Sequence, residues 1–177
     1  MADININYDF LSKQELETLN NYLQTDALWE TTQDHWSGRF INFQTINDSD
    51  ISTLVQDISN RVKDVVENYE NTSVDIETLQ LVRWRPGDKL DPPHADAEHL
   101  DGSPHPYSNR HYSALIYLNN DFMGGELFFP NQDFTPVIAP GMLVNFTGTV
   151  EHLHGVTEVT SGLRYTMVMF FTRSVYD

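Results

Sequence analysis

The first third of the chain carries apolar residues at helical spacing. Leu16, Leu19 and Leu23 follow the segment 12–15 (SKQE), whose Ser and Glu have capping-box spacing, and they predict a helix with one apolar face. After the polar residues 47–50, apolar residues recur every three or four positions for about five turns. These positions are Ile51, Leu54, Val55, Ile58, Val62, Val65, Val66 and Tyr69. The stripe predicts a second, longer helix that packs against a sheet.

From about residue 78 the pattern changes to short β-forming runs separated by Pro and Gly: LQLVRW, SALIYL, ELFF, MLVNF and RYTMVMFF. Helices that precede such strands favour an α+β, mainly β fold, in which the helices buttress a sandwich or a closed jelly roll. We expect a single domain over 1–177, with a helical support region at 1–76 and a jelly-roll core at 78–173. The polar stretch 88–109 predicts a long functional loop.

Composition and charge exclude several classes of function. With 10 Lys+Arg against 26 Asp+Glu the net charge is −16, which opposes binding to nucleic acid. The chain has no Cys, so any metal must be bound by His and carboxylate. The N-terminal sequence MADININYDF has no signal-peptide pattern, and no apolar stretch is long enough to span a membrane. We therefore expect a soluble, cytoplasmic protein without membrane or nucleic-acid partners.

Two histidine-containing segments are the candidates for a metal site. In an extended segment, residues two positions apart face the same side, so His94 and Asp96 can present an imidazole and a carboxylate to one point. Far along the chain, His152 and His154 offer a third ligand, and strand alternation does not choose between them. Two His and one carboxylate, with other positions open, suit non-haem Fe(II) and O₂ chemistry, whereas a structural zinc site is usually closed.

A basic residue begins the last predicted strand. Arg164 and Thr166 share a face that is otherwise apolar, with Val168 and Phe170. A guanidinium on an inward face needs an anion, because a buried unpaired charge is costly. A dicarboxylate would bind it in a bidentate manner, and the Thr hydroxyl would add a hydrogen bond. The alternative is that Arg164 points outward and pairs with one of the many surface acids.

Six short motifs occur in a family-specific order: WRPG (84–87), HAD (94–96), RHYSALIYLNN (110–120), GGELFFP (124–130), APGMLVNF (139–146) and HGVTEVTSGLRYTM (154–167). Over roughly residues 78–173 they resemble the prolyl 4-hydroxylase-type Fe(II)/2-oxoglutarate dioxygenases. The resemblance implies a double-stranded β-helix, a cupin-like jelly roll with preceding helices.

The resemblance also implies the metal ligands. His94, Asp96 and His154 match the three iron ligands of the family. His154 is preferred because the distal histidine of the family precedes the basic residue, here Arg164, by about this interval. His152 is then expected to be a strand neighbour, with support of the metal ligands as a candidate role.

By the same resemblance, Arg164 binds the distal carboxylate of 2-oxoglutarate and Thr166 assists it. Tyr117 matches a tyrosine that bonds the same carboxylate in some members; the alternative is a core aromatic residue. The chain departs from the family at Trp84, where a tyrosine is common, so an indole N–H replaces a phenol.

The activity implied is hydroxylation of a substrate C–H bond with release of succinate and CO₂, using Fe(II), 2-oxoglutarate and O₂, with ascorbate as a reductant. The implied substrate is proline in a peptide or protein, which makes the chain a peptidyl-proline 4-hydroxylase. One alternative is the same chemistry on a free amino acid, another side chain or a small metabolite. Another is a non-catalytic jelly-roll binding module. The sequence leaves the oligomeric state open.

Other residues are assigned more generally. Histidines in or beside the polar loop are candidates for a lid or recognition surface: His99, His105 and His111. Gly124 and Gly125 predict a tight turn with positive φ. For three residues of the N-terminal region, packing and rim contacts remain alternatives: Trp29, Trp36 and Arg39.

Overall fold

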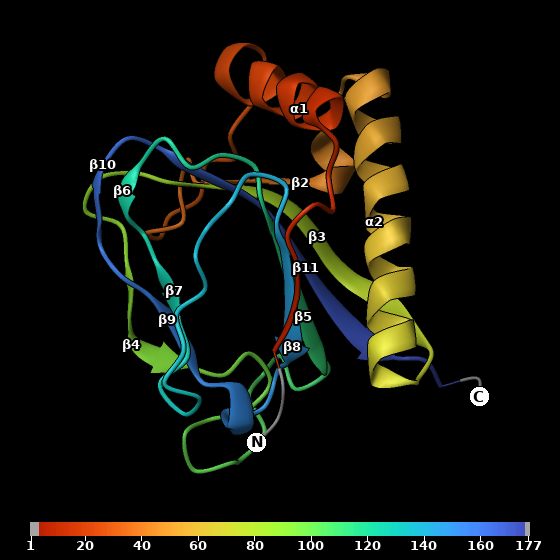
Figure 1. The fold of residues 1–177 in the computed structure, drawn as a ribbon, viewed down its shortest axis with the longest axis vertical. Helices are drawn as coiled ribbons and strands as arrows, with labels where there is room; N and C mark the ends of the chain where they lie inside the picture. Colours follow the sequence, from red (N-terminus) through yellow and green to blue (C-terminus); the bar gives the residue numbers. More distant parts are fainter. Residues whose placement is uncertain (1–3, 176–177) are drawn as a thin grey trace.

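The computed structural model describes residues 4–175 (Figure 1). The helices are α1 (Lys13–Thr25), the 3-10 helix η1 (Phe43–Thr45), α2 (Ser49–Glu70) and the 3-10 helix η2 (Val150–His152). The strands are β1 (Asn5–Asn7), β2 (Phe40–Asn42), β3 (Val74–Trp84), β4 (Leu90–His94), β5 (Tyr112–Tyr117), β6 (Met123–Gly124), β7 (Leu127–Phe128), β8 (Leu143–Thr147), β9 (His154–Val156), β10 (Val159–Ser161) and β11 (Arg164–Arg173).

Both predicted helices are present, and side chains cap their first turns. At the start of α1 the backbone N–H of Glu15 donates to Ser12 Oγ, and the backbone N–H of Ser12 donates to the Glu15 carboxylate, which completes the predicted capping box. The Asp48 side chain accepts from two backbone N–H groups at the start of α2. Within residues 4–175, neither helix has the length together with the hydropathy that a membrane crossing requires.

The strands form a large sheet and a smaller one that faces it. The six-stranded sheet has the order β1-β8-β5-β11-β3-β2, and the three-stranded sheet has the order β4-β9-β7; every neighbouring pair is antiparallel. A short pair, β10-β6, lies at one end. In Figure 1, α1 and α2 cover one side of the large sheet, and β4, β7 and β9 lie on the other. The predicted α+β fold, a double-stranded β-helix buttressed by helices, is confirmed.

Strand alternation divides the apolar residues of the large sheet between two cores. Along β11, Tyr165, Met167 and Met169 pack in the core that the helices cover. Arg164 and Thr166 have the opposite parity and line a cavity on the other face of the sheet. Leu115 and Tyr117 of β5 pack in the core between the two sheets, together with residues of β7 and β9. The interior of the jelly roll thus receives polar side chains from β11.

The structure differs from the sequence pattern in three places. The first third is not purely helical, because β1 and β2 form the two edges of the large sheet. Strands of three residues are too short to produce a periodic signal. The polar stretch 88–109 contains β4 and is therefore not one continuous loop. The prediction that His152 is a strand neighbour is wrong, since His152 ends the 3-10 helix η2 and β9 begins two residues later.

Candidate active site

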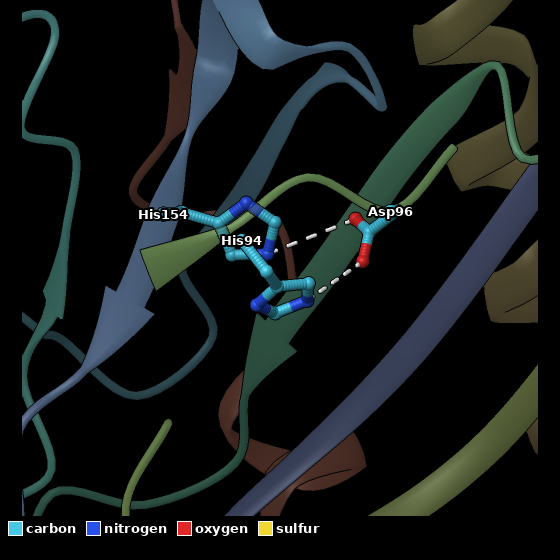
Figure 2. A group of neighbouring side chains, drawn as sticks. All are labelled: His94, Asp96 and His154. Atoms are coloured by element: carbon cyan, nitrogen blue, oxygen red, sulfur yellow. Dashed lines mark hydrogen bonds and ion pairs between the residues drawn. The ribbon is translucent and has the colours of Figure 1, made fainter. Parts of the chain in front are cut away.

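His94, Asp96 and His154 converge on one point between β4 and β9 (Figure 2). His94 ends β4 and pairs in register with His154, the first residue of β9. Asp96 follows β4 by two residues and turns its carboxylate back toward both rings. His94 Nε2 lies 3.2 Å from Asp96 Oδ1, and His154 Nε2 lies 3.7 Å from Asp96 Oδ2. One ligand atom from each residue lies within 4.8 Å of the others.

Hydrogen bonds fix the orientation of this group. His154 Nδ1 lies 3.1 Å from the backbone carbonyl of His152, and because a carbonyl only accepts, Nδ1 carries the proton. The Nε2 lone pair of His154 is then directed toward Asp96. Ser113 Oγ donates to Asp96 Oδ2 and holds the carboxylate from the side of β5. Such supporting bonds are typical of metal-binding imidazoles and carboxylates.

The charge states of the group suit a cation. Burial raises the pKa of Asp96, but His154, His94 and the Ser113 hydroxyl outweigh it and hold the pKa at about 2. Burial lowers the pKa of His154, and Asp96 opposes this only in part. At neutral pH the group therefore offers the Asp96 carboxylate and the neutral imidazole of His154, with the His94 ring beside them. That donor set, open on its remaining sides, fits Fe(II).

A second polar group lies in the same cavity. The cavity has a volume of about 390 Å³, and its lining includes the three residues of the His–Asp–His group together with Arg164 and Thr166. Arg164 is 2% exposed and Thr166 is fully buried. Arg164 Nε and Thr166 Oγ1 have no hydrogen-bond partner among residues 4–175. Because unpaired buried donors are costly, this end of the cavity fits a ligand that supplies an anionic acceptor, such as a carboxylate.

Tyr117 lies behind Arg164. Tyr117 of β5 pairs with Thr166 of β11, and the Tyr117 hydroxyl accepts a hydrogen bond of 3.0 Å from Arg164 Nη2. The ring is fully buried and is not among the residues that line the cavity. Tyr117 therefore orients the Arg164 guanidinium but does not itself line the cavity.

The structure also shows which tryptophans line the cavity and which one packs against the core. Trp36 and Trp84 line the cavity, whereas Trp29 is partly buried, stacks on Tyr165 at a centroid distance of 6.1 Å and packs against the helix-covered core. Gly125 has a φ of 64°, as expected for the turn, and a Cβ there would lie 2.9 Å from Arg164 Cδ. This glycine therefore makes room for the arginine, a role that the turn pattern does not indicate.

The histidines of the polar loop have two different environments. His99 and His105 line a second hollow of about 290 Å³, which shares His94 and Asp96 with the main cavity. His111 lies outside both, and its Nδ1 accepts from the backbone N–H of Arg173 at 3.1 Å. A recognition role thus stays open for the first two and is not supported for His111.

Comparison with known proteins places these features in a family. The sequence model of the 2OG-Fe(II) oxygenase superfamily matches residues 79–172. Prolyl 3-hydroxylase 2 of Gallus gallus is 35% identical over 141 residues, which cover 67% of this chain and 20% of that protein. Prolyl 3-hydroxylase 3 of Homo sapiens is 41% identical over 93 residues, or 46% of this chain and 13% of that protein. The chain thus spans about a fifth or less of these curated relatives.

Solved structures show the same fold at lower identity. A viral collagen prolyl hydroxylase from Paramecium Bursaria Chlorella virus-1, solved as a 2OG complex, superposes with a TM-score of 0.69 at 17% identity, covering 97% of this chain and 96% of that chain. A prolyl-4-hydroxylase of Pseudomonas putida superposes with a TM-score of 0.68 at 16% identity, covering 98% and 94%. A prolyl hydroxylase of Trichoplax adhaerens, in complex with a hypoxia inducible factor peptide fragment, has a TM-score of 0.68 at 15% identity, covering 96% and 83%.

Proposed function

The chain belongs to the 2OG-Fe(II) oxygenase superfamily, and we propose that it hydroxylates proline in a peptide or protein. It is a 2-oxoglutarate-dependent dioxygenase, and its cofactors are Fe(II), 2-oxoglutarate and O₂. We infer that residues 1–177 act as a single catalytic domain, in which 78–173 supply most of the jelly roll, and 1–76 supply the supporting helices together with the edge strands β1 and β2.

We assign the metal to His94, Asp96 and His154, and the distal carboxylate of 2-oxoglutarate to Arg164 and Thr166. The observation that carries the assignment is that one cavity contains both the His–Asp–His group and a buried guanidinium whose Nε has no partner among residues 4–175. Either half alone would allow other readings. Together they match a ligand that binds a metal at one end and carries a carboxylate at the other.

In this proposal each residue has a distinct task. When bound, Fe(II) supplies the chemistry that couples decarboxylation of 2-oxoglutarate to oxidation of a substrate C–H bond. The His152 carbonyl holds His154, and Ser113 holds Asp96, so these two metal ligands are oriented before the cation binds. Arg164 aligns the cosubstrate through two N–H donors. Apolar side chains of the cavity wall limit the access of water, and at the metal end this wall includes Phe146, whose ring centroid lies 4.7 Å from that of His154.

Proline as the substrate is supported by the relatives. The sequence relatives are named prolyl 3-hydroxylases, and the structural neighbours include a prolyl-4-hydroxylase and a prolyl hydroxylase with a bound peptide. The sequence motifs predict hydroxylation at C4 of proline. The second candidate is hydroxylation at C3, which the relatives of higher sequence identity favour. The same chemistry on another side chain or a small metabolite is the remaining alternative.

An anaerobic titration tests the site without knowledge of the substrate. Fe(II) is added to the protein and then 2-oxoglutarate, and the visible charge-transfer band of the chelate is recorded. We expect a band only after both additions, and none in His154→Ala. A folded protein that gives no band would contradict the proposed function and favour the binding-module alternative.

A product assay then tests the substrate. Proline-containing peptides are incubated with the protein, Fe(II), 2-oxoglutarate, ascorbate and O₂, and succinate is measured together with 3-hydroxyproline and 4-hydroxyproline. We expect peptides to raise succinate formation above the uncoupled background, with 4-hydroxyproline as the product. Formation of 3-hydroxyproline alone would replace the C4 assignment with C3. Absence of stimulation across a broad panel would reject proline as the substrate.

A further inference from the structure

A second arginine is buried next to the cavity. Arg39 is 3% exposed and lies immediately before β2, far in sequence from the cavity residues of β11. Its guanidinium carbon lies 4.3 Å from the ring centroid of Trp36 and 4.4 Å from that of Trp84. Both indoles line the cavity, whereas Arg39 is not among the lining residues. The arginine is therefore held behind the two indoles by cation–π contacts.

Trp84 also contacts the arginine assigned to the cosubstrate. The guanidinium carbon of Arg164 lies 5.3 Å from the Trp84 ring centroid. One indole, at the position where the family commonly has tyrosine, thus contacts two buried guanidinium groups. Arg39 and Arg164 are thus in contact with the same side chain.

The local charges near these arginines do not balance. Asp88 Oδ2 lies 3.4 Å from Arg39 Nε and 3.5 Å from Arg85 Nε, so one carboxylate serves two guanidinium groups. Arg164 Nη2 donates to the neutral hydroxyl of Tyr117. Burial lowers the pKa of Arg39, and the charges of Arg85 and Arg164 lower it further while Asp88 opposes them. The buried guanidinium groups of Arg39 and Arg164 therefore carry excess positive charge beside the cavity, because Arg39 shares its one carboxylate with the more exposed Arg85.

We propose that Arg39 is a positioning residue that strengthens the binding of a dicarboxylate cosubstrate, through its charge and through Trp84, without touching the ligand. The inference rests on the proposed function of Arg164. An anion at Arg164 relieves the repulsion between the guanidinium groups, and in a low-dielectric interior that relief adds to affinity. Asp88 acts in the opposite direction, because it already neutralises part of the charge.

The test compares two ligands that differ only in the distal carboxylate. Binding of 2-oxoglutarate and of 2-oxobutyrate to the Mn(II)-loaded protein is measured by calorimetry. We expect Arg39→Met to raise the Kd for 2-oxoglutarate by about tenfold and to leave that for 2-oxobutyrate unchanged. Arg39→Lys retains the charge and should restore most of the affinity. Asp88→Asn should lower the Kd for 2-oxoglutarate by a few-fold.

A control and two contrary results complete the design. Arg61→Met removes a guanidinium that contacts Phe10 and Glu15, away from the cavity, and should change neither Kd. If Arg39→Met weakens the binding of both ligands equally, the role of Arg39 is merely structural and the inference is overturned. The inference is also overturned if the Kd for 2-oxoglutarate is unchanged in all three variants, Arg39→Met, Arg39→Lys and Asp88→Asn. If the unmodified protein binds 2-oxoglutarate no better than 2-oxobutyrate, the proposed role of Arg164 fails first, and the inference falls with it.

Discussion

His94 and His154 are paired residues of the neighbouring antiparallel strands β4 and β9, and their ring centroids lie 4.6 Å apart. The spacing of the two imidazoles is therefore set by backbone pairing and does not depend on a flexible loop. Asp96 completes the group from the turn after β4, where Ser113 of the large sheet holds it. The proposed metal site is thus assembled from both sheets of the jelly roll, and its three side chains converge without a cation.

The distal ligand can be tested by comparing two histidines. We expect His94→Ala and His154→Ala to abolish Fe(II) binding and turnover, because each removes a nitrogen donor. His152→Ala should cost no more than about tenfold in metal affinity, since His152 supports His154 through its backbone carbonyl, which alanine retains. Titration with Co(II) and succinate release report the two quantities. Loss of metal binding in His152→Ala with retention in His154→Ala would reverse the assignment.

The pH dependence of stability follows from the buried imidazole. The pKa of His154 is lowered from its ordinary 6.5, so just below that pH the unfolded chain binds more protons at this position than the folded protein. The contribution of His154 to the stability of the metal-free protein should therefore be level above pH 6.5 and fall as the pH falls below 6.5. The total loss should be about 1.4 kcal/mol for each unit by which folding lowers the pKa of His154.

Chemical unfolding between about pH 5 and 8 measures this dependence. His154→Gln removes one titrating group and should make the curve less steep, while the slope that His111 contributes remains. Because His111 is also buried in part and its pKa is also lowered, His111→Gln is the matched control for a histidine outside the cavity. An unchanged slope in His154→Gln would show that His154 does not titrate as the structure indicates.

The proposed roles of Arg164 and of Tyr117, which supports it, can be distinguished by their effects on the affinity for 2-oxoglutarate. We expect Arg164→Ala to raise the 2-oxoglutarate requirement by about a hundredfold with little change in metal affinity, because Arg164 lines the same cavity but is not part of the His–Asp–His group. Tyr117→Phe removes only the acceptor of Arg164 Nη2, so the increase should be about tenfold. Equal 2-oxoglutarate affinity in Arg164→Ala and the unmodified protein would refute the role.

Much of the fold follows from local patterns. The two helices have clear periodicity, five short β-forming runs stand out between Pro and Gly, and the capping box at Ser12 marks the start of α1. The parity of Arg164 and Thr166 correctly predicts that the two residues share a face, and the structure decides between the two open directions, because both line the cavity. The edge strands β1 and β2 could not be predicted in this way, because a segment of three residues is too short to show a hydrophobic period. They are defined only by pairing with distant strands.

The residues that support the site are harder to find in the sequence. Ser113 is one of many polar residues in a strand until β5 is placed beside Asp96. Arg39 lies in a segment without any pattern, and its position behind Trp84 depends on the pairing of β2 with β3. Such contacts depend on register between distant segments, which a single sequence does not encode locally.

Thr166 gives a prediction in which stability and binding change in opposite directions. Its Oγ1 is buried and has no hydrogen-bond partner among residues 4–175. Thr166→Val replaces the hydroxyl with a methyl group of similar size, so without ligand the protein should become more stable, by about 1 kcal/mol. The same change removes a donor for the distal carboxylate, so the Kd for 2-oxoglutarate should rise about three- to tenfold. Thr172→Val, on the same strand beyond the cavity, is the matched control. A Thr166→Val protein that binds 2-oxoglutarate as tightly as the unmodified one would exclude the hydroxyl from the cosubstrate site, whatever its effect on stability.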